Sequence, residues 1–406
     1  MFWVRPHTLT WKLFSISLVA DSLSNLRFSF LSVLIFLFFD SSSNLAFAED
    51  PSYCQSEDVI ILGSQSEVDL FQATYGPNCD TTMHGLQVGY KNSFNSSLSN
   101  LNGLSGLKKI QGGLELSNNY SLIDTSGLSD LVEIEGGIKV YGNANSNYTS
   151  DEMSLSLPLL TTVGGDIDIR SESGFRHNGF AASALVNLGG SLSLTGDYLS
   201  LLSLPNLKQI QGGLTVSRTR LRELDLASLT LVGGDISIAS NPKLELMNFA
   251  GLTTVNGLTI SDNGSLTDVD TLSSITTAGG DVSITSNAFL RNLDGLSSLT
   301  SISGSMVVEG NFSLPDVDGL NSLAAVENLT ITGNPALRYC GGVYGLVSSG
   351  LDIADMTVNN NGIGCKSVDA VTATQGVLTD RLAYCYAPDV IILGSQSEVD
   401  LFQATY

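Results

Sequence analysis

Charged residues, and basic residues above all, are scarce in this sequence. They make up 14% of its 406 residues, against about 25% in an average domain. Lys and Arg together number 18 against 40 Asp and Glu, which gives a net charge of −22. Nucleic-acid binding requires a basic face, so we exclude that class of function. Hydrophobic residues reach 43%, and a chain rich in apolar and poor in charged residues is not intrinsically disordered.

Residues suited to catalysis and to metal binding are also few. Of three His, only His84 and His177 lie beyond residue 48, and neither has a patterned nucleophile beside it. No two Cys have the close spacing of a zinc site. The stretch Asp316–Gly319 matches part of a calcium loop but lacks the closing Glu. We therefore expect no enzymatic activity, no catalytic or metal-binding residues and no cofactor.

The first 48 residues have the layout of a secretory signal peptide. Residues 28–39 (FSFLSVLIFLFF) carry no charge, and as a helix of about 18 Å they are too short for a hydrocarbon core of about 30 Å. Ala46-Phe47-Ala48 fits a cleavage signal. We expect secretion with removal of residues 1–48, and an uncleaved signal anchor is the alternative. Membrane contact is expected only through this segment or through an anchor further downstream.

The five Cys and a long exact repeat explain each other. Residues 58–75 and 389–406 are identical (DVIILGSQSEVDLFQATY), and the same offset of 331 maps Cys54 onto Cys385. We interpret residues 384–406 as the start of a second, truncated copy. The other four Cys form two pairs, each with a separation of 25. We predict disulfides within these pairs, although four Cys permit three pairings. The pairs are Cys54–Cys79 and Cys340–Cys365.

Between the two Cys pairs the chain repeats about every 24 residues. Each unit begins with a short strand whose first and third residues are apolar, so one face of the strand is buried. We call the first of these residues the anchor. Gly two residues before the anchor indicates a corner with positive φ or close contact between coils. Asn five residues after the anchor predicts side-chain bonds to a neighbouring coil. The anchors are Leu86, Leu114, Ile138, Ile167, Leu192, Leu214, Ile236, Leu258, Val282, Met306 and Leu329.

No single unit of this kind buries its apolar face alone, so the units must stack. We predict an all-β-rich fold, a right-handed parallel β-solenoid of about eleven coils, over residues 49–383. The end coils would expose apolar faces and open strand edges. We expect disulfide-closed caps there, at residues 54–85 and 338–383.

The repeat, L-x-x-L-x-x-I-x-G-x-[LIM]-x-[LIV]-x-x-N-x-x-L with bridged ends, resembles the receptor L domain. This family occurs in the ectodomains of insulin and growth-factor receptors, and related repeats occur in fungal cell-wall and microbial surface proteins. The resemblance covers about residues 54–385 and implies a leucine-rich-repeat-like solenoid at the cell surface. Eleven coils exceed the short receptor version, and receptor signalling is not implied.

The outward positions of the expected sheet lie one and three residues after each anchor. In the earlier coils they are charged or large, as at Glu115, Lys139 and Arg170. From the fifth coil onward they are mostly Ser and Thr, which are also ordinary exposed strand residues. We predict that these hydroxyl residues form a binding face. They are Ser193, Thr195, Thr215, Ser217, Ser237, Thr259, Ser261, Ser283, Thr285, Thr330 and Thr332.

These features together predict an extracellular or cell-surface, non-enzymatic recognition or adhesion module in a tandem array. Its partner would be an extracellular protein or a neutral glycan, because a strongly acidic chain repels anionic glycans. A structural cell-wall or envelope protein is the first alternative, and an ice-binding protein the second.

Six N-x-[S/T] sequons are present, and in three of them the Asn belongs to the repeated Asn position. A buried role there would compete with glycosylation. We therefore expect Asn95 and Asn147, which lie in less regular stretches, to carry any glycans.

Overall fold

A computed structural model of the chain describes residues 53–373 apart from 92, 96, 146, 148–150 and 172–173. The chain divides into two units, Met1–Glu49 and Asp50–Tyr406, and the described residues all belong to the second. The predicted signal peptide (1–48) and the predicted second copy (384–406, with Cys385) lie outside the described residues.

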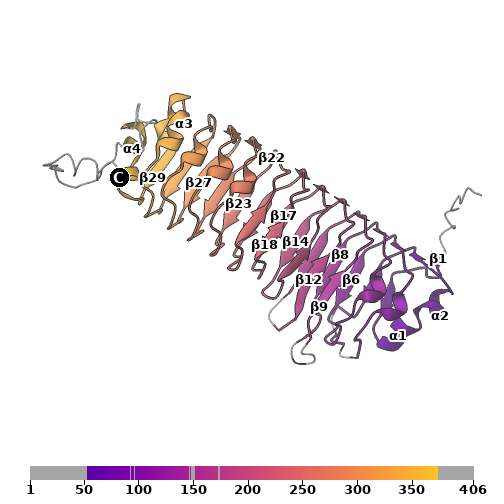
Figure 1. The fold of residues 1–406 in the computed structure, drawn as a ribbon. Helices are drawn as coiled ribbons and strands as arrows, with labels where there is room; N and C mark the ends of the chain where they lie inside the picture. The colour runs from indigo at the N-terminus through magenta and orange to yellow at the C-terminus, as the bar shows by residue number, and fades with distance from the viewer. Residues whose placement is uncertain are drawn as a thin grey trace, which may run out of the picture. The chain divides into compact units, whose positions relative to one another are not determined.

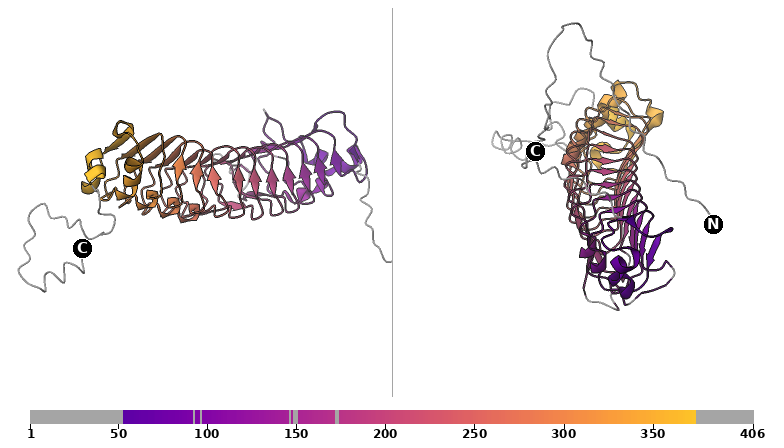
Figure 2. Two further views of the ribbon diagram at one scale, coloured as in Figure 1. Left: turned by 90° about the horizontal axis from the view of Figure 1, so that it is seen from above. Right: turned by 90° about the vertical axis from the view of Figure 1, so that its right-hand side faces the viewer.

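Short parallel strands stacked along a rod form the described part of the chain (Figures 1 and 2). In it, thirteen strands build one continuous sheet along one side. In spatial order they are β2 (Ile60–Leu62), β4 (Leu86–Val88), β6 (Leu114–Ser117), β8 (Ile138–Tyr141), β11 (Ile167–Arg170), β14 (Leu192–Thr195), β17 (Leu214–Ser217), β20 (Ile236–Ala239), β23 (Leu258–Ser261), β25 (Val282–Thr285), β27 (Ser305–Glu309), β28 (Asn328–Thr332) and β29 (Met356–Asn359).

A second row of two-residue strands comes just before the main strand in most coils. It consists of β1 (Tyr53–Cys54), β3 (Thr81–Thr82), β5 (Lys109–Ile110), β7 (Glu133–Ile134), β10 (Thr162–Val163), β13 (Asn187–Leu188), β16 (Gln209–Ile210) and β19 (Leu231–Val232), then β22 (Thr254–Val255), β24 (Thr277–Ala278) and β26 (Ser301–Ile302).

The return side of the coils has 3₁₀ turns towards both ends of the described chain and short strands between them. Its strands are β9 (Met153–Ser156), β12 (His177–Ala181) and β15 (Leu201–Ser203) in one sheet, and β18 (Glu223–Asp225) and β21 (Leu246–Asn248) in another. Its 3₁₀ turns are η1 (Asn102–Leu104), η2 (Ser126–Leu128), η3 (Asp270–Leu272), η4 (Asp294–Leu296), η5 (Asp318–Leu320) and η6 (Gly341–Val343). Buried apolar side chains from Cys54 to Val371 fill the interior as one continuous cluster.

The parallel β-solenoid predicted from the sequence is confirmed, and so is its register. Each anchor pairs with the anchor of the next coil, from Leu86 opposite Leu114 to Met306 opposite Leu329. All eleven anchored strands predicted from the sequence lie in this sheet, which has thirteen strands in the described chain. The extra strands, β2 and β29, come from the two caps. Ile60 pairs with Leu86 and Met356 pairs with Leu329, which continues the anchor column in both directions.

Both predicted disulfides are present, and each belongs to a cap. Cys54 is bridged to Cys79 and Cys340 to Cys365, with Cα–Cα distances of 4.8 and 5.6 Å. Short helices close the ends of the core. They are α1 (Gln65–Asp69) and α2 (Phe71–Tyr75) at the N-terminal end, and α3 (Tyr344–Ser348), η7 (Ile353–Asp355), η8 (Ile363–Cys365) and α4 (Val368–Ala373) at the C-terminal end.

Buried Asn side chains join successive coils, as the sequence predicts. In one example, Asn241 Nδ2 donates to the Val216 carbonyl of the preceding coil at 3.0 Å, and Asn241 N donates to Asn263 Oδ1 of the next coil at 3.2 Å. We call this series the Asn ladder; in the described chain its hydrogen bonds join Asn119 to Asn143, and then run from Thr219 to Asn361.

The Gly two residues before the anchor allows close contact between coils, and it does not adopt positive φ. A Cβ placed on Gly234 would lie 2.9 Å from the Gly213 nitrogen, whereas one on Gly280 would have its nearest neighbour at 3.5 Å. Positive φ occurs instead four residues after the anchor, at Asn118, Arg218, Ser240, Asp262 and Ser286 among others. The interpretation of this Gly as a positive-φ corner is therefore wrong, and the close-contact alternative is correct.

His177 is buried at an irregularity of β12, where the register with β9 shifts between His177 and Gly179. Its Nε2–H donates to the Gly179 carbonyl at 3.0 Å, and its Nδ1 has no hydrogen-bond partner in the described structure. Burial lowers the pKa of His177 from 6.5 to about 4, against the opposing effect of the bond to Gly179. The imidazole is therefore neutral at pH 7.

The first prediction compares two Gly that share one position in the repeat. Gly234→Ala should destabilise the protein by about 1–3 kcal/mol, because the added methyl group meets backbone atoms that cannot rotate away. Gly280→Ala should change the free energy of unfolding by less than about 0.5 kcal/mol, since its Cβ would make an ordinary contact. Chemical denaturation measures both, and equal destabilisation would contradict the close-contact explanation.

The second prediction concerns the stability of the protein at acidic pH. Between pH 6.5 and 4 the unfolded chain binds a proton at His177 and the folded chain does not. Stability therefore falls as the pH drops through this window, by up to about 3 kcal/mol from this group alone. His177→Gln should remove that part of the pH dependence, measured as the free energy of unfolding at a series of pH values. A variant that keeps the full slope would show that other groups cause it.

Candidate binding face

The strand pairing brings the eleven predicted hydroxyl residues onto one face. The residue one after the anchor and the residue three after it both point outward, and each stands opposite its equivalent in the next coil. Ser193 lies opposite Thr215, which lies opposite Ser237. Two parallel columns result, with about 4.8 Å between strands and about 7 Å between the columns. We call this surface the hydroxyl face.

Most hydroxyl groups of this face form no hydrogen bond with another described residue. In the described part of the chain, only Thr332 uses its side chain in a hydrogen bond within the protein, donating to Asn359 Oδ1 at 2.8 Å. The other ten lack any recorded partner among the described residues and are partly exposed. A row of unsatisfied hydroxyls can both donate and accept, and is therefore suited to polar, uncharged ligands.

The columns are longer and less uniform than the sequence suggests. Strand β29 extends them by Thr357 and Asn359, which lie opposite Thr330 and Thr332. These two residues are not among those predicted from the sequence, because residues 356–359 were expected to belong to the C-terminal cap. Val307 and Glu309 of β27 interrupt the columns near this end. Ala239 of β20 also breaks the column three residues after the anchor. The longest unbroken stretch of hydroxyls is therefore the column one residue after the anchor, from Ser193 of β14 to Ser283 of β25.

The N-terminal part of the same sheet has a different character. Glu115 accepts a hydrogen bond from the Tyr141 hydroxyl at 2.8 Å and pairs with Lys91 at 3.4 Å. Asp168 and Arg170 form an ion pair at 2.7 Å. These charges lie on β6, β8 and β11, upstream of the hydroxyl face, so the sheet presents a charged region and an almost uncharged region in sequence along the rod.

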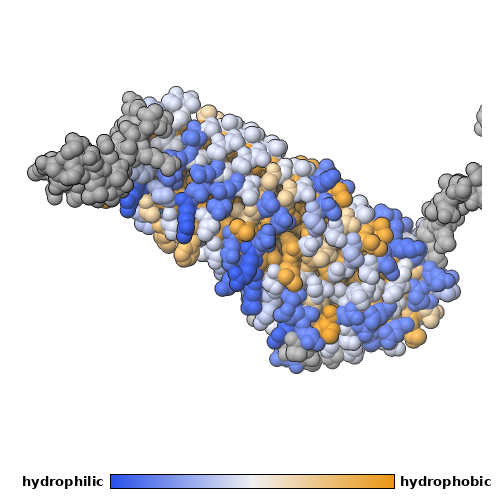
Figure 3. Space-filling view, in the orientation of Figure 1, coloured by the Kyte–Doolittle hydropathy of each residue, from blue (hydrophilic) through white to orange (hydrophobic). Residues whose placement is uncertain are grey.

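The surface in Figure 3 is largely of intermediate hydropathy, with smaller hydrophilic and hydrophobic groups between. The described part of the chain brings together no group of three His, Cys, Asp or Glu that could hold a metal ion. His84 is exposed and His177 is buried, and they lie in different coils. Among the described residues, no helix has the length and apolar composition needed to cross a membrane.

The structure separates the sequons by accessibility. Asn95 is 7% exposed and its Nδ2 donates to the Gly63 carbonyl, so a glycan there would require this contact to open. Asn119, Asn263 and Asn311 are buried in the Asn ladder. Asn147 is exposed, as is Asn328 at the start of β28, which the sequence analysis did not select.

Comparisons with known proteins give one partial similarity. No family model matches the chain. The chain is similar to the sporulation-specific protein 22 of Saccharomyces cerevisiae, with 34% identity over 84 residues. The match covers 20% of this chain and 18% of the yeast protein, so the chain spans less than a fifth of the length of that relative.

Proposed function

We propose that the protein is a non-enzymatic recognition or adhesion module of the cell exterior, related to the receptor L domains. The hydroxyl face would bind an extracellular protein or a neutral glycan. Two disulfides support an oxidising compartment, because such bonds are rare in the reducing cytosol. The predicted signal peptide is consistent with this location.

The observation that carries the proposal is the in-register series of hydroxyls without partners. Exposed strand residues often bond to each other or to neighbouring loops, yet ten of the eleven predicted here have no such recorded bond within the described chain. Most coils from β14 to β28 add hydroxyls at the same two positions in the same orientation, and Ala239, Val307 and Glu309 are the exceptions. Several weak contacts along one rigid rod then act together, which raises the effective concentration of the ligand at each site.

Ligand charge follows from the protein's own charge. The net charge of −22 disfavours an anionic polymer along the rod. Within the hydroxyl face, Glu309 is the charged residue among the outward positions of β14 to β28, and it adds to this repulsion. Neutral glycans and neutral or basic protein surfaces fit the face best.

The third prediction tests this face by adding bulk and charge. The triple variant Thr215→Arg, Thr259→Arg, Ser283→Arg should bind at least about tenfold more weakly, which corresponds to about 1.4 kcal/mol. Its free energy of unfolding should change by about 0.5 kcal/mol or less for each substitution, because these side chains point away from the core. Binding is measured on an array of neutral glycans and extracellular proteins.

The matched control places three Arg elsewhere on the rod, as Thr253→Arg, Ser273→Arg and Ser297→Arg. These residues are exposed and lie outside the main sheet, so this variant should bind like the parent. Equal binding by all three proteins would reject the hydroxyl face as a binding site and favour a structural spacer. Ice affinity measured on the same variants tests the ice-binding alternative, since the ordered water would depend on the unbroken column from Ser193 to Ser283.

A further inference from the structure

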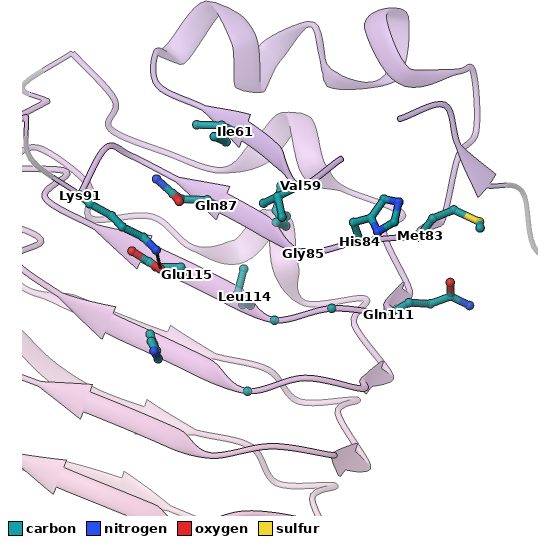
Figure 4. Close-up of a pocket in the computed structure, with 15 residues that line it drawn as sticks. Val59, Ile61, Met83, His84, Gly85, Gln87, Lys91, Gln111, Leu114 and Glu115 are labelled. Atoms are coloured by element: carbon teal, nitrogen blue, oxygen red, sulfur yellow. Dashed lines mark ion pairs between the residues drawn. The ribbon is translucent and has the colours of Figure 1, made fainter. Parts of the chain in front are cut away.

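A hollow of about 730 Å³ lies over the first four strands of the main sheet, outside the hydroxyl face (Figure 4). Its floor is a column of three Gly, each placed just before an anchor: Gly85, Gly113 and Gly137. Adjacent coils are joined directly beneath it, by Leu86 N to the Gly113 carbonyl and Leu114 N to the Gly137 carbonyl, both at 2.9 Å. Three successive positions without side chains expose flat backbone, which creates the depression.

In most later coils the same position carries a side chain, and the two later Gly, Gly213 and Gly257, are each flanked by coils that have one. Asp166 Oδ1 accepts a hydrogen bond from Ser191 N, and Asp235 Oδ1 accepts one from Gly257 N. A floor of three adjacent Gly therefore exists only at the N-terminal end of the described sheet, where the hollow lies.

One wall of the hollow is apolar and exposed. Ile61 lies on the edge strand β2 and Val59 directly precedes that strand. Val59 is 49% exposed, and Ile61 and Met83 are each 46% exposed. Figure 4 shows Val59 and Ile61 along one side and Met83 near His84 at one end. Large apolar side chains exposed together around a concave surface are typical of a protein-binding site.

The facing wall is polar and contains a cation without a partner. Gln87 and Glu115 stand on β4 and β6, followed by Lys139 on β8. Glu115 is already paired with Lys91, and Asp168 with Arg170. Lys139 lies opposite Glu115 and Asp168 in the register, is exposed, and forms no ion pair with any described residue.

We propose that this hollow is a docking site for a segment of another protein in which an aliphatic side chain stands next to a carboxylate. The aliphatic side chain would lie on the glycine floor against Val59, Ile61 and Met83, and the carboxylate would pair with Lys139. The amides of Gln87 and Gln111 would bond the main chain of the segment. The distribution of groups supports a peptide over a saccharide, because the lining contains no aromatic ring for a sugar to stack on. The site does not depend on the hydroxyl face binding anything.

Small probes carry the two recognised groups separately. N-acetyl-leucine has an aliphatic side chain and a carboxylate, its amide lacks the carboxylate, and N-acetylglycine lacks the side chain. Titrated into the full chain, N-acetyl-leucine should shift the methyl signals of Met83 and Ile61 in NMR spectra at millimolar concentrations. The amide and N-acetylglycine should bind more weakly, each by about threefold or more.

Substitutions in the hollow test separately the residues that would contact the carboxylate and those that would contact the aliphatic side chain. Lys139→Met should weaken the binding of N-acetyl-leucine by about threefold or more and leave the binding of its amide unchanged, because only the carboxylate contacts Lys139. Ile61→Ser should weaken the binding of both N-acetyl-leucine and its amide, because both contain the aliphatic side chain. Lys243→Met, which removes an exposed cation from another coil, and Leu246→Ser, which removes an exposed apolar side chain on the return side, should change neither.

Three outcomes would overturn the proposal: no shift of Met83 or Ile61 with N-acetyl-leucine up to tens of millimolar, equal binding by Lys139→Met, or binding of glucuronate in place of N-acetyl-leucine. The last result would identify the hollow as a site for acidic sugars. The triple Arg variant of the hydroxyl face should bind N-acetyl-leucine normally, so the two proposals fail separately.

Discussion

The hydrogen bonds of the buried Asn hold the coils of this protein at one spacing and one register. The Nδ2 of each ladder Asn donates to a backbone carbonyl of the preceding coil, as Asn241 does to Val216. Its Oδ1 accepts from the backbone N–H of the ladder Asn in the preceding coil, as Asn263 does from Asn241. The polar groups of a tight turn are thereby satisfied without water. The residue before it adopts positive φ, which points the Asn inward. The Gly before the strand then lets the backbones of adjacent coils come into contact. In the coils that have this corner it supports the sheet register, and the pairings from β8 to β14 keep the same register without a ladder bond.

Much of this architecture is predictable from the sequence, because every coil of a solenoid must bury an apolar strand face and satisfy the polar groups of a tight corner. Apolar alternation located the strands, and Asn and Gly at fixed distances located the corners. The end coils were missed because the caps replace these signals: Asp58 and Ala354 stand where Gly is found elsewhere. Asn361, five residues after Met356, was the available signal for β29. The positive-φ position was not predictable, since Asn118, Arg218, Ser240 and Gly310 share no side-chain chemistry.

The two candidate surfaces differ in how far the sequence reveals them. The hydroxyl face follows from strand alternation alone, since outward residues can be counted from each anchor. The hollow depends on three Gly that resemble the ordinary Gly pairs of the other coils. Only the fold shows that Gly85, Gly113 and Gly137 are stacked, and that Val59 and Ile61 of a cap strand overlook them. The sequence likewise does not distinguish Lys139 from other surface charges, because only the structure shows that Glu115 pairs with Lys91 and Asp168 with Arg170.

The interruption of the Asn ladder has a mechanical consequence. Its described hydrogen bonds end at Asn143 and resume at Thr219, and over the coils between them the return side forms the sheet of β9, β12 and β15 instead. Across this gap the coils are joined by the main sheet from β8 to β17, and on the return side by β12, the strand that contains buried His177. Solenoid stability is a sum of contacts between neighbouring coils, so the loss of stability in acid that His177 causes would fall on the coils around β12 and not on the disulfide-closed ends. The hollow lies on one side of β12 and the hydroxyl face on the other.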